Sequence, residues 1–237
     1  MTFELVVNDV PADVLVPRLE ALARESIAAR GRFAIALPGG SVATSCFPRF
    51  ALADVDWGKT HFFWGDDRAV PASHPDSNYG VAKKLWLDVI EDRKPIVHRM
   101  EAEDPKLDQA ARRYEHVLRE NGPIDLALLG MGPDGHVCSL FPGHALLEEA
   151  EKLVAPIFDS PKPPPRRITL TFPALFAAEQ VIVVAIGEAK AELARQVQTD
   201  ASSPLPVARA LRGARSGMLV LDRAAASKIE SASAGRA

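Results

Sequence analysis

The fold is decided by residues 124–136, which read IDLALLGMGPDGH. The first six residues are mostly apolar, as in a strand that is buried on both faces of a parallel sheet. The glycine-rich residues that follow place Asp134 and His136 directly after this strand. In open α/β sheets, ligands bind at the carboxyl ends of the strands, where loops supply polar groups. We therefore expect Asp134 and His136 to belong to a site at the edge of such a sheet.

Short apolar runs alternate with longer amphipathic segments on both sides of this stretch. The alternation predicts a modified Rossmann-like α/β fold, with a doubly wound, mostly parallel sheet, helices on both faces and a single domain. Further strands are expected at residues 3–7, 33–37, 61–64, 153–158, 167–171, 181–186 and 218–221, and helices at 14–29, 41–52, 78–90, 104–120 and 188–198. We expect residues 1–223 to form the domain and the Ala- and Ser-rich residues 224–237 to fray.

The composition argues against several classes of protein. The chain has 237 residues and a net charge of −3, which disfavours nonspecific binding to nucleic acid. Its two cysteines, Cys46 and Cys138, have no metal-like spacing, so neither a disulfide framework nor a metal site is expected. The first residues do not resemble a signal peptide, and no apolar run approaches the ~20 residues of a membrane span. We expect a cytoplasmic protein with no membrane partner.

A first candidate loop, Gly39-Gly40-Ser41, follows the strand expected at 33–37. Two glycines allow the backbone to approach a ligand closely, and the helix that begins near Ser41 offers free N–H groups and a positive dipole end. These features are typical of a phosphate site. The alternative is a plain strand-to-helix turn in which Ser41 caps the helix.

A second candidate loop follows the strand expected at 61–64 and contains Asp66, Asp67 and Arg68. Adjacent carboxylates and an arginine can serve acid–base chemistry, bind ligand hydroxyls or bind an anion. The alternative is a solvated acidic turn in which Arg68 pairs locally. Residues 76–78, Asp-Ser-Asn, can equally cap the next helix.

His136 is the candidate general base, because imidazole is the usual proton acceptor near neutral pH. A single histidine is more often structural, but this one follows an apolar strand in a loop too rich in glycine to be built for packing. Asp134 can orient its ring or bind a hydroxyl. Arg167, next to Arg166, and Lys190, at a helix start, are candidate cations for an anionic ligand, and the alternative for Lys190 is an ordinary surface lysine.

Together these motifs resemble the 6-phosphogluconolactonase family, which shares a superfamily with the glucosamine-6-phosphate isomerases and deaminases. The resemblance covers nearly the whole chain and is most specific in the Asp-Gly-His-x-x-Ser-Leu-Phe-Pro-Gly block at 134–143. The motifs at 163–171, 187–190 and 205–207 support it. The resemblance implies hydrolysis of 6-phosphoglucono-δ-lactone to 6-phosphogluconate, in the oxidative pentose phosphate pathway, with no metal and no organic cofactor. We expect a monomer that acts on this small-molecule sugar-phosphate lactone.

The resemblance also implies roles for the candidate residues. His136 would be the general base, and Asp66, Arg68 and Asp134 would line the lactone. The phosphate would be held by the backbone of the Gly-Gly-Ser loop and by two cations, and the residues concerned are Gly39, Gly40, Ser41, Arg167 and Lys190.

Three positions separate this chain from its relatives. Val42 stands where the family usually has threonine, and Asp67 where it usually has glutamate, which leaves the role of Asp67 open. Related deaminases carry a glutamate five residues after the histidine, whereas this chain has Phe141, which cannot transfer a proton. Phe141 therefore favours a lactonase over an amino-sugar-phosphate isomerase or deaminase. His136 favours both enzymes over a non-catalytic sugar-phosphate-binding module.

Overall fold

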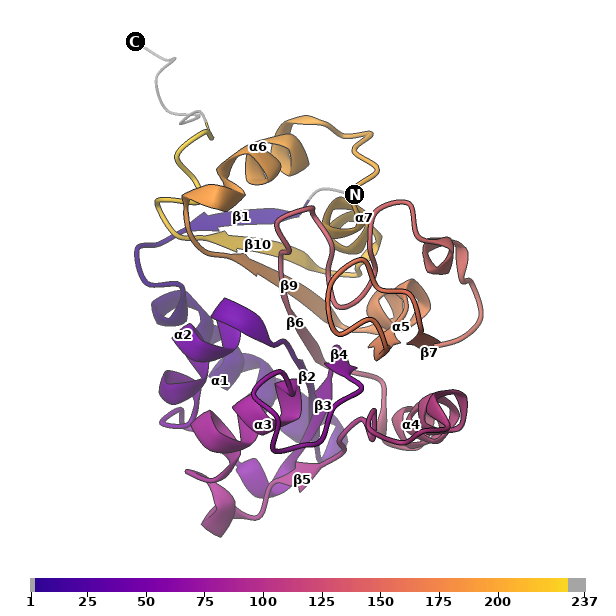
Figure 1. The fold of residues 1–237 in the computed structure, drawn as a ribbon. Helices are drawn as coiled ribbons and strands as arrows, with labels where there is room; N and C mark the ends of the chain where they lie inside the picture. The colour runs from indigo at the N-terminus through magenta and orange to yellow at the C-terminus, as the bar shows by residue number, and fades with distance from the viewer. Residues whose placement is uncertain (1–2, 230–237) are drawn as a thin grey trace.

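The computed structural model describes residues 3–229, and its main feature is a seven-stranded sheet in which every strand pair is parallel (Figure 1). The strand order is β1-β10-β9-β6-β2-β3-β5. The strands are β1 (Glu4–Val7), β2 (Phe33–Leu37), β3 (Thr60–Trp64), β5 (Ile96–Val97), β6 (Leu126–Gly130), β9 (Gln180–Ala185) and β10 (Gly217–Leu221). The chain runs outward from β2 to β5 on one side and from β6 to β10 on the other, so the direction of winding reverses between β2 and β6.

Helices cover both faces of this sheet, as the alternating sequence pattern predicts. The helices are α1 (Pro11–Arg30), α2 (Gly40–Phe50), α3 (Asn78–Ala82), α4 (Leu107–Asn121), α5 (Phe172–Ala177), α6 (Ala191–Thr199) and α7 (Pro206–Gly213). Short turns of other helical types are η1 (Trp57–Lys59), η2 (Lys83–Leu87), η3 (Glu91–Arg93), η4 (Ala145–Glu148) and η5 (Glu188–Lys190). Helices α1, α2 and α3 lie on one side of the strands, and α4, α5 and α7 lie on the other (Figure 1). This arrangement confirms the predicted fold class.

A second, antiparallel sheet of three strands was not expected. It consists of β4 (Asp66–Arg68), β8 (Arg167–Leu170) and β7 (Val154–Ile157). Strands β7 and β8 were correctly predicted as strands, but as members of the main sheet. The residues of β4 were predicted to form a loop. Three consecutive charged residues carry no apolar alternation, so β4 exists only because its backbone pairs with β8, with Asp66 opposite Thr169.

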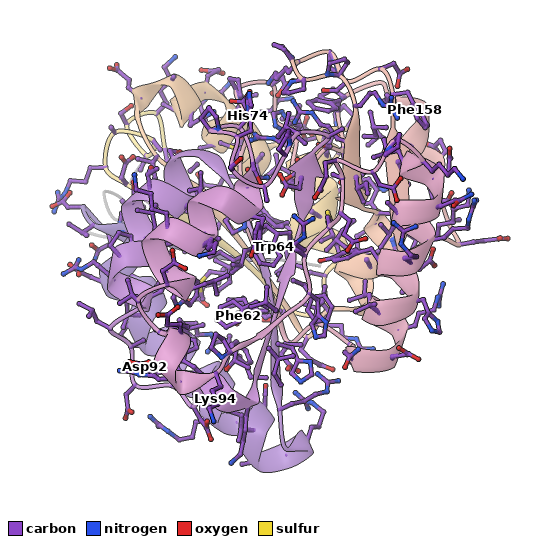
Figure 2. The ribbon with its side chains drawn as sticks, turned by 60° about the horizontal axis from the view of Figure 1, so that its bottom comes forward. Phe62, Trp64, His74, Asp92, Lys94 and Phe158 are labelled. Carbon is purple, nitrogen blue, oxygen red and sulfur yellow. The ribbon has the colours of Figure 1, made fainter. Side chains whose placement is uncertain are left out.

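An aromatic cluster attaches α2 and α3 to the sheet. Phe62 and Trp64 lie in the middle of the molecule on β3, with His74 beyond its carboxyl end (Figure 2). The Trp86 ring packs edge-on against Phe62, with 5.1 Å between ring centroids, and lies 5.2 Å from Phe47 of α2. Buried aromatic contacts of this kind are rigid. They therefore fix the second half of α2 and η2 against β3.

Helix boundaries differ from the expected ones near the site. The residue that caps α2 is Gly39, and Ser41 lies inside the first helical turn, so the expected capping role of Ser41 is wrong. Gly39 takes that position because it lies two residues after the end of β2, its backbone is extended and α2 begins at the next residue. Ser77 does cap α3, because its Oγ accepts a hydrogen bond from the N–H of Gly80 at 3.1 Å. The helix expected at 78–90 changes to a π-helical turn, η2, at Lys83.

The chain after β10 continues as turns up to Ile229, and within this part Ala225 is fully buried. The Asp222 carboxylate accepts hydrogen bonds from the N–H groups of Gly187 and Ala225. Residues 230–237, which belong to the tail expected to fray, lie outside the described residues. Between residues 3 and 229, no helix is both long and apolar enough to cross a membrane.

Candidate active site

A cavity of about 380 Å³ opens at the carboxyl ends of β2 and β6, where the winding of the sheet reverses. Crevices at this point are the usual ligand sites of doubly wound sheets. All three candidate loops reach the cavity. The candidate residues that line it are Gly39, Gly40, Ser41, Asp66, Arg68, His136, Arg167 and Lys190. Asp134 does not line it but lies behind His136.

Gly39 and Gly132 must be glycines because other side chains lie very close to their Cα atoms. A Cβ on Gly132 would lie 2.1 Å from the His136 ring, and a Cβ on Gly39 would lie 1.8 Å from the side-chain oxygen of Asn78. Any larger residue would therefore displace the histidine or the asparagine. The glycine-rich sequence is explained here by the need to bring two loops against functional side chains.

The His136 ring is held by Asp134, whose carboxylate contacts ring atom Nδ1. Because an ionised carboxylate can only accept, Nδ1 carries the proton and Nε2 keeps its lone pair for the cavity. Lys162 donates to the same Asp134 oxygen at 3.0 Å. Burial acts to raise the pKa of Asp134, but the hydrogen bonds from Lys162 and His136 outweigh burial and hold this pKa at about 2. The carboxylate is therefore ionised over the whole working range of pH.

The surroundings of His136 lower its pKa and so favour the neutral ring. Burial is the largest influence on its pKa and lowers it, while Asp134 acts to raise it. The buried ring of Phe141 contributes to this environment, since its centroid lies 4.7 Å from that of His136. A neutral imidazole with a free Nε2 is the form that accepts a proton.

Asp66 lines the cavity as part of a buried polar cluster. Its carboxylate accepts hydrogen bonds from Ser139 Oγ at 2.6 Å and from Asn78 Nδ2 at 3.1 Å. A guanidinium nitrogen of Arg167 lies 3.7 Å from the same carboxylate. Since Asp66 is already engaged by these donors, its position suits holding Arg167 in place better than proton transfer.

Arg68 combines one satisfied nitrogen with one that is unpaired. Its Nη1 donates to the carbonyl oxygen of Asp76 at 2.7 Å, whereas its buried Nε has no acceptor within residues 3–229. A buried donor without a partner is costly in a folded protein. The Nε is shielded from solvent, but the residue lines the cavity, so the guanidinium of Arg68 is the candidate donor to a ligand oxygen on this side.

A second group of cavity residues is suited to a phosphate. The first N–H groups of α2, at Gly40 and Ser41, have no partner inside the helix and face the cavity end of β2. Lys190 reaches the cavity from η5, and burial followed by the charge of Lys162 lowers its pKa. Of the adjacent pair Arg166 and Arg167, only Arg167 lines the cavity, because Arg166 is exposed and bonds the carbonyl of Pro105 instead.

Asp67 holds the second loop together and does not line the cavity. Its buried carboxylate accepts N–H bonds from Arg68 and Asn78, both at 2.8 Å, and from Tyr79 at 3.1 Å. Burial raises its pKa to about 6, against the opposing effect of these bonds. The structure thus answers the question that the sequence leaves open for this residue. Val42 is buried and lines the cavity, but its apolar side chain offers no polar atom to a ligand.

Sequence reasoning missed three residues of the site, namely Lys162, Asn78 and Ser139. Lys162 stands among four prolines at 161–165, and a lysine in so stiff a loop was the one available signal. Asn78 and Ser139 act through contacts with Asp66, which lies 12 and 73 residues away from them in the chain. Among residues 3–229, no group of three His, Cys, Asp or Glu side chains is placed to hold a metal ion.

Comparison with known proteins gives a family for this geometry. A family model described as glucosamine-6-phosphate isomerases/6-phosphogluconolactonase matches residues 8–220. The chain belongs to this family. It is 43% identical over 210 residues to the 6-phosphogluconolactonase of Rattus norvegicus, covering 83% of this chain and 80% of that protein. It is 36% identical over 238 residues to the 6-phosphogluconolactonase of Mycobacterium tuberculosis, covering 93% and 96%. The resemblance read from the motifs is confirmed.

Solved structures of the family share its fold. The 6-phosphogluconolactonase of Trypanosoma brucei superposes with a TM-score of 0.84 at 27% identity, covering 97% of this chain and 99% of that one. A monomeric glucosamine-6-phosphate deaminase superposes with a TM-score of 0.77 at 17% identity, covering 95% and 100%. The second likeness concerns the fold alone.

Proposed function

We propose that this chain hydrolyses 6-phosphoglucono-δ-lactone to 6-phosphogluconate, the second step of the oxidative pentose phosphate pathway, with His136 as general base. The observation that carries the proposal is the imidazole of His136, which Asp134 holds at Nδ1 and which shares a cavity of about 380 Å³ with Lys190 and the start of α2. The similarity to proteins named 6-phosphogluconolactonase supports the choice of substrate.

The chemistry needs one water, one base and one oxyanion donor. His136 Nε2 takes a proton from water, and the resulting hydroxide attacks C1 of the lactone to form a tetrahedral oxyanion. When the oxyanion collapses, the bond from C1 to the ring oxygen breaks, and the protonated imidazole returns its proton to that oxygen. The products are a carboxylic acid, which ionises, and a free hydroxyl, so the histidine ends the cycle in its starting form.

Two of the groups on the cavity wall make this step fast. A positioned general base contributes about 10²–10⁴-fold to the rate. An oxyanion donor contributes about 10²–10³-fold, and the guanidinium of Arg68, which lines the cavity, is our candidate for it. Neither group requires a covalent intermediate. Cys138 is a poor nucleophile because burial raises the pKa of its thiol well above the usual value.

The phosphate would lie beside Lys190, Arg167 and the first residues of α2. Lys190 and Arg167 supply charge, and the N–H groups of Gly40 and Ser41 supply hydrogen bonds at the positive end of the α2 dipole. Binding the phosphate at a distance from the reacting carbon fixes the lactone against His136. This contribution is one of orientation.

The position of Phe141 weighs against the deaminase alternative. Its ring packs against His136, where related deaminases carry a glutamate that takes part in proton transfer. The apolar ring of Phe141 cannot accept a proton, so it supplies no second base beside His136. We expect the protein to leave glucosamine 6-phosphate unchanged.

The test is hydrolysis of 6-phosphoglucono-δ-lactone by the purified protein, corrected for spontaneous hydrolysis. His136→Ala is expected to lower kcat by about 10²–10⁴-fold, while 6-phosphogluconate still binds in calorimetry. His116→Ala is the matched control, because His116 is an exposed histidine on α4. Unchanged turnover in His136→Ala would overturn the role of His136, and no turnover by the wild type would overturn the function itself.

We further propose that residues 1–223 carry this activity as a cytoplasmic monomer. The candidate site residues lie between Gly39 and Lys190 of a single chain, which supports a monomer. A mass measured by light scattering that corresponds to one chain is the expected result. A dimer at the concentration of the assay would contradict it.

A further inference from the structure

Lys162 is a cavity residue whose backbone is held from two directions. Ser160 Oγ accepts a hydrogen bond from the Lys162 N–H at 3.2 Å and donates one to the Lys162 carbonyl at 2.9 Å. Arg167 donates to the same carbonyl at 3.0 Å. The side chain of Lys162 therefore extends from a rigid point of the proline-rich loop, which limits where its ammonium group can lie.

The ammonium group lies behind the proposed general base. Its Nζ is 3.0 Å from Asp134 Oδ1 and 3.2 Å from His136 Nδ1. Since Nδ1 carries the proton that Asp134 accepts, the ammonium donates to Asp134 and is held beside the imidazole as a positive charge. It also lies 6.0 Å from the ring centroid of Phe141. About a third of the Lys162 side chain is exposed, so its charge is only partly screened by solvent.

We propose that Lys162 is a positioning residue that fixes the Asp134 carboxylate on His136 and holds the imidazole in its neutral, proton-accepting form. The inference rests on the proposed lactonase function. Lys162 acts in two ways: by a charged hydrogen bond, which keeps Asp134 ionised and oriented, and by repulsion, which disfavours a second proton on His136.

The charged groups that face His136 allow the sign of the effect to be worked out. Burial lowers the pKa of His136, Asp134 and Asp66 raise it, and Lys162 lowers it. Replacing Lys162 by a neutral residue removes one lowering influence and leaves both carboxylates. The pKa of His136 therefore rises, and a larger fraction of the enzyme is protonated and inactive at a given pH. The acid limb of the pH profile of kcat/KM moves to higher pH.

A competing role is that of a third cation for the phosphate. The charge of Lys162 is felt by Lys190, whose pKa it helps to lower, so the two ammonium groups belong to neighbouring parts of the cavity. The two roles differ in what they change. A phosphate-binding lysine alters KM for the phosphorylated lactone alone, whereas a positioning lysine alters kcat for phosphorylated and unphosphorylated lactones alike.

The experiment compares Lys162→Met and Lys162→Arg with wild type, using 6-phosphoglucono-δ-lactone and unphosphorylated glucono-δ-lactone between pH 5 and 8. For Lys162→Met we expect kcat to fall about tenfold on both substrates, the equivalent of one charged hydrogen bond. We also expect the acid limb to move up by roughly half a unit to one unit, and Lys162→Arg to restore most of both properties. Lys152→Met is the control, because Lys152 is an exposed lysine that pairs only with Glu149.

A second readout needs no activity. The ring-proton shifts of His136 are followed by NMR in the ligand-free protein, with the signal identified by its absence in His136→Gln. A higher pKa for His136 in Lys162→Met supports the proposal, and an unchanged pKa overturns it. A wild type that hydrolyses the lactone beside a Lys162→Met variant with unchanged kcat overturns this inference alone. A rise in KM confined to the phosphorylated substrate also overturns it, in favour of the phosphate role.

Discussion

Two groups of residues at the cavity treat charge in different ways. In the first group, His136, Asp134 and Lys162 satisfy one another within hydrogen-bonding distance. In the second group, Lys190 has no side-chain partner within residues 3–229, and Gly40 and Ser41, at the start of α2, line the cavity. The difference follows from what each group must do. A base must be held in one orientation before the substrate arrives, whereas a binding group must leave its donors free for the ligand.

The sharpest way to break this comparison is Asp134→Asn. The amide cannot stabilise a protonated imidazole, and it loosens the choice between Nδ1 and Nε2 protonation, so we expect kcat to fall by about 10²–10⁴-fold. KM should change only a few-fold, because Asp134 does not line the cavity. Steady-state kinetics decide the matter. A large rise in KM with kcat preserved would mean that Asp134 binds the lactone directly.

The proposed phosphate-binding role of Lys190 is tested by Lys190→Met. Removing one charged contact to phosphate costs about 1.5–3 kcal/mol, so KM for 6-phosphoglucono-δ-lactone should rise about 10–100-fold. KM for glucono-δ-lactone should stay near the wild-type value, since it has no phosphate. Lys228→Met, in which an exposed lysine near Glu192 is replaced, is the control. Equal effects on both lactones would remove Lys190 from the phosphate site.

The smallest expected effect on catalysis comes from Asp67→Asn. The Asp67 carboxylate accepts backbone N–H bonds within its loop and does not line the cavity. One of its oxygens becomes a donor that faces backbone N–H groups, so we expect a loss of about 1–3 kcal/mol in the free energy of unfolding. For a chain of this size each kcal/mol lowers Tm by about 2–4 °C. Denaturant titration measures the loss, and kinetics should show kcat and KM within a few-fold of wild type.

The same variant carries a pH signature. The folded protein raises the pKa of Asp67 to about 6 from an ordinary value of 3.8, so the associated stability is present below pH 4 and is lost as pH rises through 6. Asparagine does not ionise and lacks this dependence. The stability gap between wild type and Asp67→Asn should therefore narrow between pH 4 and pH 7. A gap that widens over this range would show that the N–H bonds to the carboxylate outweigh its burial.

Strands were the part of the fold most readable from the sequence. Runs such as 33–37 and 181–185 are fully buried in a parallel sheet, and burial on both faces requires uninterrupted apolar residues, which are visible in the sequence. Strand β4 was unreadable for the opposite reason. Its residues are all charged, and its conformation comes from pairing with β8 about a hundred residues later.

The site divides in the same manner. Local sequence patterns predicted His136, Arg68 and the Gly39–Ser41 turn, because strand-end loops, glycines and helix starts are local features of the chain. Lys162 did not, since nothing in a proline-rich loop reveals which carboxylate its lysine will reach. The link from Ser139 to Asp66 spans 73 residues and had no signal at all.

The sequence by itself determined the parallel α/β fold, the family and the chemical types present at the strand ends, because each depends on periodicity or on residues close together in the chain. Only the tertiary structure decided the partnerships among those types. It placed Asp134 behind His136 instead of against the lactone, set Lys162 beside that pair, and assigned Asp67 to the loop. The physical reason is that the charge state and orientation of a side chain depend on neighbours in space, which the order of residues does not specify.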